Sequence, residues 1–256
     1  MDTDILLNDF AIRSFRDMAD GDYVVARMAY RAQFPAQFMW SALQAVEKYL
    51  KCILVLNRVK ATGLGHDLGK ALARAETQLP FKLKLSDKSR EIIRHLNAYG
   101  RFRYFESSYH VWDLEMTKLD LAVWELRRYC ADLNYSLTLP DGKKRPMVDL
   151  ELKAIEESDK RHRTRYTRIG GILEKIVRGK KSVQRDALVW QNPCFGRMAR
   201  RTISPLNYLQ AANSPLSLHP EILDEVLKYV QLPKEAIVAY REHARSEAQK
   251  RSRKKP

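Results

Sequence analysis

The sequence predicts a mainly α-helical protein, with a helical bundle over residues 1–135 and a basic, mostly helical extension over 136–256 that begins with a short β-hairpin. Apolar residues recur at three- and four-residue steps through the first half, which is the spacing of one helix face. The connections between these stretches are short, as in helical bundles. Charge separates the two halves, because Lys and Arg exceed Asp and Glu by 3 in residues 1–135 and by 12 in residues 136–256.

The most apolar stretch, residues 36–58, is expected to form the central helix of the bundle. Its inward positions are Phe38, Ala42, Val46, Leu50, Ile53 and Leu54. Pro35 suits the first turn, because its missing N–H would have no helical partner there. A polar turn with two glycines follows at 61–65, and Asp67 is then placed to cap a helix over 67–78.

Four further helices complete the first half. They are expected at 4–18, 23–30, 88–98 and 111–132. The tripeptide Asp20-Gly21-Asp22 should separate the first two, and Gly100 should end the third. Residues 101–109, which are aromatic and charged, are interpreted as a loop.

The chain changes character at Tyr135. Residues 135–139 alternate like a strand, Pro140-Asp141-Gly142 is a turn tripeptide, and 146–149 is the candidate return strand of a hairpin that would be marginal alone. Further helices are expected within 150–178, interrupted at Gly170-Gly171, and at 220–230 and 233–249. Residues 179–215 are interpreted as loop-rich around an apolar group at 187–190, and 251–256 as a frayed basic tail.

Composition excludes several classes of protein. The three cysteines, Cys52, Cys130 and Cys194, are far apart and lack metal-ligand spacing, so we expect reduced thiols and no metal or other cofactor. The N-terminus lacks the layout of a signal peptide, and the longest apolar run, 52–56, is too short to cross a bilayer. A soluble, cytoplasmic protein without membrane contact is therefore expected. No P-loop, dinucleotide-binding or zinc-finger spacing occurs.

Several segments resemble the signature of HEPN domains. They are ALQAVEKYLK at 42–51, His66-Asp67-Leu68, RHLNAYG at 94–100, and Arg103-Tyr104-Phe105, in that order. The resemblance covers about residues 1–135 and implies a helical bundle. It also implies a homodimer, because HEPN domains commonly pair. It implies no single activity, since HEPN proteins include ribonucleases, toxins, nucleotide binders and catalytically silent adaptors.

The resemblance also points to candidate catalytic residues. HEPN ribonucleases carry an Arg, four to six residues, then a His, which acts on the ribose 2′-hydroxyl or the leaving oxygen while the Arg steadies the phosphate charge. In that register Arg94 matches, but Tyr99 occupies the His position. A phenol with a pKa near 10 is a poor base at neutral pH. The usual catalyst is therefore expected to be absent, and packing against a neighbouring helix is the simpler role of Tyr99.

Two other Arg and His pairs have a permitted spacing. They are Arg90 with His95 and Arg103 with His110, and about two such pairs are expected by chance from the number of arginines and histidines. Five positions on a helix separate side chains by roughly 140°, which argues against Arg90 and His95. The pair Arg103 and His110 stays a candidate.

Polar residues near the centre of the bundle have a simpler interpretation. Glu47 and Lys51 are spaced as a helix-surface ion pair, which contributes a few tenths of a kcal/mol. His66 next to Asp67 is interpreted as part of the helix start rather than as a titrating site.

Residues 160–201 form the most basic segment, with 13 Lys and Arg against Glu174 and Asp186. Aromatic residues lie between the basic ones, which suits phosphate contact combined with base stacking. The candidate nucleic-acid contacts are Arg161, Arg163, Arg165, Arg168, Lys180, Lys181, Arg200 and Arg201. A solvated face, or a surface for an acidic protein, is the alternative.

These observations favour a HEPN-like protein that associates with RNA or other nucleic acid through its basic extension and is catalytically weak or silent. One alternative is a metal-independent HEPN ribonuclease or toxin. Another is an interaction module for an acidic partner such as an antitoxin or a nucleotidyltransferase.

Overall fold

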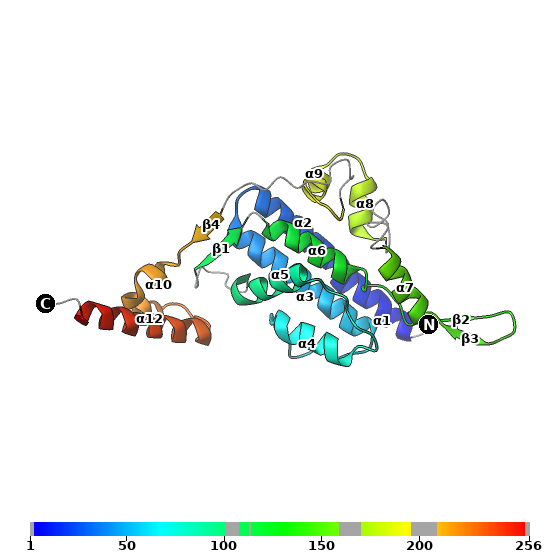
Figure 1. Cartoon of the computed structure of the whole chain (residues 1–256), viewed down its shortest axis with the longest axis horizontal. Helices are drawn as coiled ribbons and strands as arrows, with labels where there is room; N and C mark the ends of the chain where they lie inside the picture. Colours follow the sequence, from blue (N-terminus) through cyan, green and yellow to red (C-terminus); the bar gives the residue numbers. More distant parts are fainter. Residues whose placement is uncertain (1–2, 101–107, 113, 159–169, 196–208, 254–256) are drawn as a thin grey trace. The chain divides into compact units, whose positions relative to one another are not determined.

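The computed structural model describes residues 3–100, 108–112, 114–158, 170–195 and 209–253 (Figure 1). These residues are mainly helical, as predicted, and their strands form two two-stranded sheets. The chain divides into two compact units, one of residues 1–101 and 113–207 and one of residues 102–112 and 208–256. The predicted boundary at residue 135 stays a prediction, and these units divide the chain elsewhere.

The first unit begins with one continuous helical run. Helix α1 (Thr3–Ala11) passes through a π-helical turn, η1 (Ile12–Arg16), into α2 (Asp17–Arg31). The predicted break at residues 20–22 is wrong. Asp20 is fully buried and bonded to other helices, while Asp22 pairs with Lys48. These tertiary partners outweigh the cost of about 1 kcal/mol that Gly21 adds inside a helix.

Helix α3 (Pro35–Leu56) is the central element that the apolar pattern predicted. It packs against α1, α2, α4 and α6, and the predicted core positions Phe38, Val46 and Leu50 are fully buried. Pro35 lies in the first turn, as expected. A tight turn with Gln33 at φ 60° reverses the chain, so α3 returns along α2 (Figure 1).

Three helices and a second π-helical turn complete the bundle. They are α4 (Leu68–Gln78), α5 (Asp87–His95), η2 (Leu96–Gly100) and α6 (Glu115–Arg127). Asp67 caps α4 as predicted, because its Oδ1 accepts a hydrogen bond from the Lys70 amide at 2.9 Å. Ser86 caps α5 in the same way, through the Ser89 amide. Residues 101–107, predicted as a loop, lie outside the described residues.

The predicted hairpin is present and projects from the helices of the first unit (Figure 1). Strands β2 (Ser136–Thr138) and β3 (Lys144–Pro146) pair in antiparallel fashion around a turn in which Gly142 has φ 79°. The return strand begins two residues earlier than expected, because the chain already enters α7 (Val148–Ser158) at Val148.

Residues 170–195 fold back onto the bundle. The helix expected before residue 178 is present after Gly170-Gly171, whereas a second helix forms within the stretch from residue 179 that was expected to be loop-rich. Helix α8 (Ile172–Arg178) and helix α9 (Val183–Val189) both pack on α2. The predicted apolar group supplies this contact, since Ala187 and Leu188 are buried.

The second unit joins residues that are distant in sequence. Strand β1 (Tyr109–Trp112) pairs with β4 (Leu209–Ala212), so the expectation of a helix from residue 111 and of loop at 209–212 is wrong. The unit continues through α10 (Pro215–Leu218), η4 (Pro220–Ile222) and α11 (Leu223–Val226) to α12 (Lys234–Arg253). Its core joins Leu216, Leu223, Leu232, Ala236 and Tyr240.

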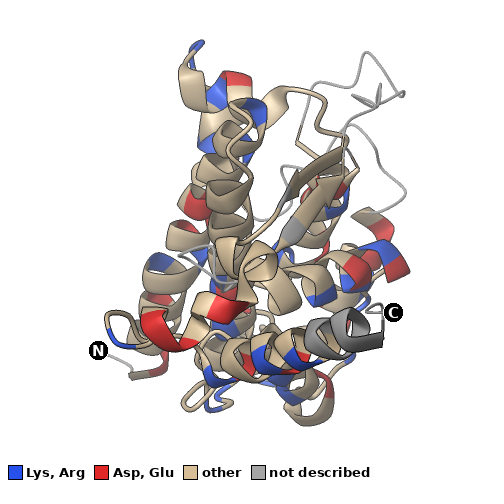
Figure 2. Ribbon diagram, turned by 90° about the vertical axis from the view of Figure 1, so that its left-hand side faces the viewer, with Lys and Arg blue, Asp and Glu red and all other residues tan. Residues whose placement is uncertain are grey.

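Charge on α12 is mixed. In Figure 2 both basic and acidic positions follow one another along this helix. Residues 254–256 of the predicted basic tail lie outside the described residues, while residues 251–253 continue α12. None of the helices that the structure describes is long and apolar enough to span a membrane.

Candidate functional site

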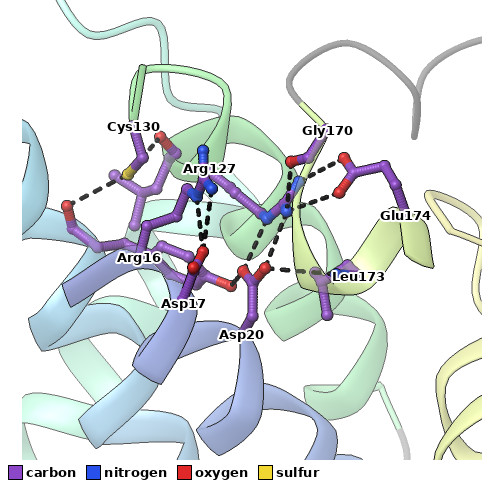
Figure 3. A network of polar contacts seen from close by, with 10 residues as sticks. Arg16, Asp17, Asp20, Arg127, Cys130, Gly170, Leu173 and Glu174 are labelled. Atoms are coloured by element: carbon purple, nitrogen blue, oxygen red, sulfur yellow. Dashed lines mark hydrogen bonds and ion pairs between the residues drawn. The ribbon is translucent and has the colours of Figure 1, made fainter. Parts of the chain in front are cut away.

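A buried ion network attaches α8 to the helical bundle (Figure 3). Arg127 on α6 donates to both carboxylate oxygens of Asp20 on α2, at 2.7 and 2.8 Å, and to both of Glu174 on α8, at 2.6 and 2.7 Å. Its Nη2 also donates to the Gly170 carbonyl at 3.1 Å. Burial by itself lowers the pKa of Arg127, but Asp20 and Glu174 outweigh it and leave the pKa of the guanidinium raised. Three elements are therefore joined by one cation.

A second buried arginine attaches α9. Arg27 on α2 pairs with Asp120 on α6 and donates through Nε to the Ala187 carbonyl at 2.8 Å and through Nη2 to the Trp190 carbonyl. The Tyr23 hydroxyl donates to Asp120 at 2.6 Å. Burial raises the pKa of Asp120, although Arg27 acts in the opposite direction. Two backbone carbonyls at the end of α9, those of Ala187 and Trp190, thus accept hydrogen bonds from a cation that belongs to the bundle.

These two attachments hold α8 and α9, which belong to the described part of the basic segment 160–201, on the bundle. Next to the buried Glu174, the side chains of Lys175, Arg178, Lys180 and Lys181 are exposed. Lys180 and Lys181 are thus the predicted nucleic-acid contacts that the structure describes. The other six, Arg161, Arg163, Arg165, Arg168, Arg200 and Arg201, lie outside the described residues.

The residues that align with the catalytic motif of HEPN ribonucleases, Arg94 and Tyr99, lie on α5 and η2. Arg94 is exposed in the last turn of α5, and Tyr99 is half-buried in η2. The Tyr99 ring contacts the His95 ring, with centroids 5.1 Å apart at 53°. Arg90 pairs instead with Glu76 on α4 at 2.5 Å. The motif position therefore presents an arginine, a phenol and a partly covered imidazole on one helical run.

Close packing holds η2 in place. A Cβ added to Gly100 would lie 3.0 Å from the Met39 carbonyl oxygen and 3.1 Å from the Leu43 Cβ. Asn97 accepts a hydrogen bond from the Leu68 amide at 2.8 Å, which caps the start of α4. The segment RHLNAYG is thus fastened to both α3 and α4.

The interpretation of Glu47 as part of a surface ion pair is wrong. Its side chain is only 7% exposed, and it binds Lys51 at 2.5 Å and the Nδ1 of His66 at 2.8 Å. The His66 ring also contacts Trp40 edge to face. Glu47 therefore ties the α3–α4 connection to the central helix. The sequence accounts for the burial of Glu47, because this residue lies on the same helix face as Leu43, Leu50 and Leu54.

The structure describes only one member of the remaining candidate pair, Arg103 and His110. His110 lies on β1 of the second unit, where its ring contacts Trp112 at a centroid distance of 5.9 Å. Arg103 lies outside the described residues. Among the described residues, no group of three or more His, Cys, Asp or Glu side chains is placed to hold a metal ion.

A polar groove of about 460 Å³ lies beside the connection between α3 and α4. Two of its basic side chains are already used, since Arg58 pairs with Asp4 at 2.9 Å and Arg74 donates to the Lys60 and Thr62 carbonyls. Its arginines thus serve the fold rather than a free anion site.

Sequence reasoning did not find the buried ion networks. Their signal was present, because Asp20, Tyr23 and Arg27 recur at the spacing of a buried face of α2. Polar residues at that spacing indicate a buried network when partners exist on neighbouring elements.

Comparison with known proteins identifies the bundle. The family model described as HEPN domain matches residues 12–122. That stretch begins in η1, ends within α6 and includes the ALQAVEKYLK, HDL and RHLNAYG segments. No curated protein and no solved structure gives a significant match. Residues 12–122 of this chain are a HEPN domain.

Proposed function

We propose that this HEPN-domain protein associates with RNA or other nucleic acid through its basic segment, residues 160–201. The observation that carries the proposal is the burial of one of the two acidic residues in this segment. The segment holds thirteen basic residues and two acidic ones, Glu174 and Asp186, and Glu174 is buried and paired with Arg127. Glu174 therefore does not offset the positive charge that the segment presents to solvent.

Electrostatics favours a polyanion as the ligand. Each phosphate neutralised by a Lys or Arg releases condensed counterions, and this gain is independent of base sequence. The exposed side chains Arg178, Lys180 and Lys181 follow one another at the end of α8, where the buried ion networks hold the backbone. We expect strong salt dependence and little base preference.

A charge-removal experiment tests the proposal. The variant Arg178→Gln, Lys180→Gln, Lys181→Gln should weaken binding to a single-stranded RNA and reduce the slope of log K against log salt by about 0.7 for each phosphate that the variant no longer neutralises. The matched control, Lys60→Gln, Lys82→Gln, Lys88→Gln, removes three exposed charges from the bundle and should keep wild-type affinity. The same test applies to Arg161→Gln, Arg163→Gln, Arg165→Gln, Arg168→Gln.

The control variant distinguishes RNA binding by a defined segment from a general attraction between the positively charged protein and RNA. Equal losses in both triple variants would refute a defined binding segment. If the wild type binds RNA equally well at low and high salt, binding through phosphate charge is refuted. Binding of an acidic protein instead of RNA would support the interaction-module alternative.

The HEPN motif position supports weak or absent cleavage. Tyr99 stands where HEPN ribonucleases have a histidine, and a positioned general base contributes about 10²–10⁴-fold in rate. Wild type, Arg94→Ala, His110→Ala and Tyr99→His are to be compared on one RNA with chelator present. We expect background cleavage in the first three. Robust wild-type cleavage that His110→Ala abolishes would show an active site that uses His110, against this proposal.

A further inference from the structure

The β2–β3 hairpin extends from the first unit as an exposed two-stranded ribbon (Figure 1). Every residue of its two strands is exposed to solvent. The pairing continues at both ends, because the Met147 amide donates to the Tyr135 carbonyl at 2.9 Å and the Leu139 amide donates to the Lys143 carbonyl at 2.8 Å. The Tyr135 hydroxyl also donates to Glu151 on α7 at 3.1 Å. A two-stranded hairpin contributes little stability by itself, so contact with a partner is the role that this anchored and exposed ribbon suits.

The register of the hairpin sorts its side chains into two faces. Residues paired across the strands share a face, and successive residues alternate between faces. Leu137 pairs with Arg145, and Thr138 pairs with Lys144. The first face, here called the leucine–cation face, has leucines on one side and cations on the other, and the second face is polar. The leucine–cation face carries Leu137, Leu139, Lys143 and Arg145, and the second face carries Ser136, Thr138, Lys144 and Pro146.

The charge of the hairpin favours an anionic partner. Three consecutive basic residues, Lys143, Lys144 and Arg145, stand against one acidic residue, Asp141. Asp141 stabilises the turn, because its Oδ1 accepts a hydrogen bond from the Lys143 amide at 3.1 Å. Its Oδ2 lies 3.4 Å from the Lys143 Nζ, but both side chains are more than half exposed, so this ion pair is weak and can be replaced by a phosphate contact. Neither Lys144 nor Arg145 forms an ion pair with another described residue.

We propose that this hairpin enters the major groove of duplex DNA, with the leucine–cation face towards the base edges. The major groove of B-form DNA is about 12 Å wide and admits a two-stranded β-ribbon, whose strands lie roughly 4.8 Å apart. In this placement Lys143 and Arg145 donate to guanine N7 and O6, and the leucines contact thymine methyl groups. Lys144, on the opposite face, contacts the backbone phosphates. The inference rests on the proposed association with nucleic acid and names duplex DNA as the form that the hairpin recognises.

The composition and shape of the hairpin separate duplex DNA from other anionic partners. The major groove of A-form RNA is deep and narrow, and side chains cannot read it. Single strands are bound by stacking their bases on aromatic side chains, and residues 136–146 include no aromatic residue. A lipid surface gains little here, because two leucines bury fewer CH₂ groups than one myristoyl chain, whose membrane binding is itself marginal.

Fluorescence anisotropy with the full chain measures the contribution of the hairpin. The probes are a B-form DNA duplex, an RNA duplex of the same sequence and a single-stranded RNA. The variant Lys143→Gln, Lys144→Gln, Arg145→Gln should weaken binding to duplex DNA about tenfold or more. The slope of log K against log salt should fall by about 0.9 for each phosphate contact that is lost. Binding to the single strand should change by less than about twofold, because a single strand offers no groove.

Two further variants separate groove contact from general attraction. The matched control Lys60→Gln, Lys82→Gln, Lys88→Gln removes the same charge from the bundle and should keep wild-type affinity for every probe. The variant Leu137→Ser, Leu139→Ser keeps the charge, so it should weaken binding to duplex DNA several-fold without changing the salt slope. Both leucines are exposed, at 47 and 37%, so its thermal unfolding by circular dichroism should match that of wild type.

Dimethyl sulfate protection identifies the groove, because guanine N7 lies in the major groove and adenine N3 in the minor groove. Wild type should protect guanine N7, and the hairpin charge variant should not. Protection confined to adenine N3 would overturn the inference. Equal losses in the hairpin charge variant and its control would also overturn it, as would equal wild-type affinity for the DNA and RNA duplexes. Hairpin-dependent binding to phosphatidylserine vesicles, without hairpin-dependent DNA binding, would assign the ribbon to a membrane surface instead.

The proposed function and this inference fail separately. RNA binding that depends on Arg178, Lys180 and Lys181, together with wild-type DNA affinity in the hairpin charge variant, would refute only the role of the hairpin. DNA binding that depends on the hairpin, together with RNA binding that the Arg178→Gln, Lys180→Gln, Lys181→Gln variant leaves unchanged, would refute only the binding role of residues 160–201.

Discussion

Replacing Arg127 with Met should destabilise the protein strongly, because the substitution leaves two buried carboxylates without their shared cation. The Arg127 side chain is 2% exposed, and those of Asp20 and Glu174 are 0 and 3% exposed. Four hydrogen bonds of 2.6–2.8 Å join it to their four oxygens. Met fills a similar volume, so the change removes charge and hydrogen bonds more than packing.

The expected cost is about 3–5 kcal/mol, the usual effect of removing one partner of a buried ion pair. Asp20 retains bonds from the Tyr49 hydroxyl at 2.7 Å and the Leu173 amide at 3.4 Å, which limits the loss on its side. Glu174 loses both of its bonds to the guanidinium. Since domains of this size are stable by about 5–15 kcal/mol, the variant should still fold at low temperature.

Urea unfolding followed by circular dichroism measures this cost as a shift of the midpoint. Glu174→Gln is the milder companion, expected to cost about 1–3 kcal/mol, and it should open residues 170–185 to trypsin while the bundle stays folded. The triple variant Arg127→Met, Asp20→Asn, Glu174→Gln should recover part of the loss, because it leaves no unpaired charge. A cost below about 1 kcal/mol for Arg127→Met would refute the view that this network holds α8 in place.

Three further substitutions test the bundle by chemical denaturation. Leu50→Ala should cost about 2–5 kcal/mol, because Leu50 is fully buried in α3; a cost below about 1 kcal/mol would contradict its core position. Gly100→Ala should cost about 1–3 kcal/mol, because the new Cβ would lie 3.1 Å from the Leu43 Cβ; wild-type stability would show that η2 yields freely. Asp67→Ala should cost about 0.5–2 kcal/mol through loss of the α4 cap. Burial by itself raises the pKa of Asp67, but hydrogen bonds from Lys70 leave this pKa lowered from 3.8. The stabilisation of wild type relative to Asp67→Ala should therefore be complete above pH 3.8 and should disappear as the pH falls through the lowered pKa. A difference in stability between wild type and Asp67→Ala that does not change with pH would contradict this expectation.

Local physics explains which features could be predicted from the sequence. The central helix, the Asp67 cap and the turn at Gly142 each depend on residues within a few positions of one another. Apolar spacing, capping side chains and a glycine at positive φ favour these structures without any contact from a distant segment of the chain. The HEPN resemblance has the same origin, because it rests on short segments in a fixed order.

Long-range partners explain the errors. The break expected at Gly21 does not occur, because Asp20 binds Arg127, 107 positions away, and this bond is absent from any local window. Strand β1 was expected to be helix and loop, because its partner β4 lies about 100 positions further along the chain. Intrinsic preferences differ by at most about 1 kcal/mol per residue, so one buried ion pair or one strand partner can reverse them.

The sequence by itself determined that the chain is mainly helical, that residues 12–122 match the HEPN domain, and that positive charge is concentrated in residues 160–201, since these follow from residue order and count. Only the tertiary structure decided that Glu174 is buried against Arg127, and that the leucines of the β2–β3 hairpin are exposed. The physical reason is that burial is a property of pairs of elements. Whether a carboxylate cancels a surface charge, or a Leu is exposed, depends on the segment that packs against it.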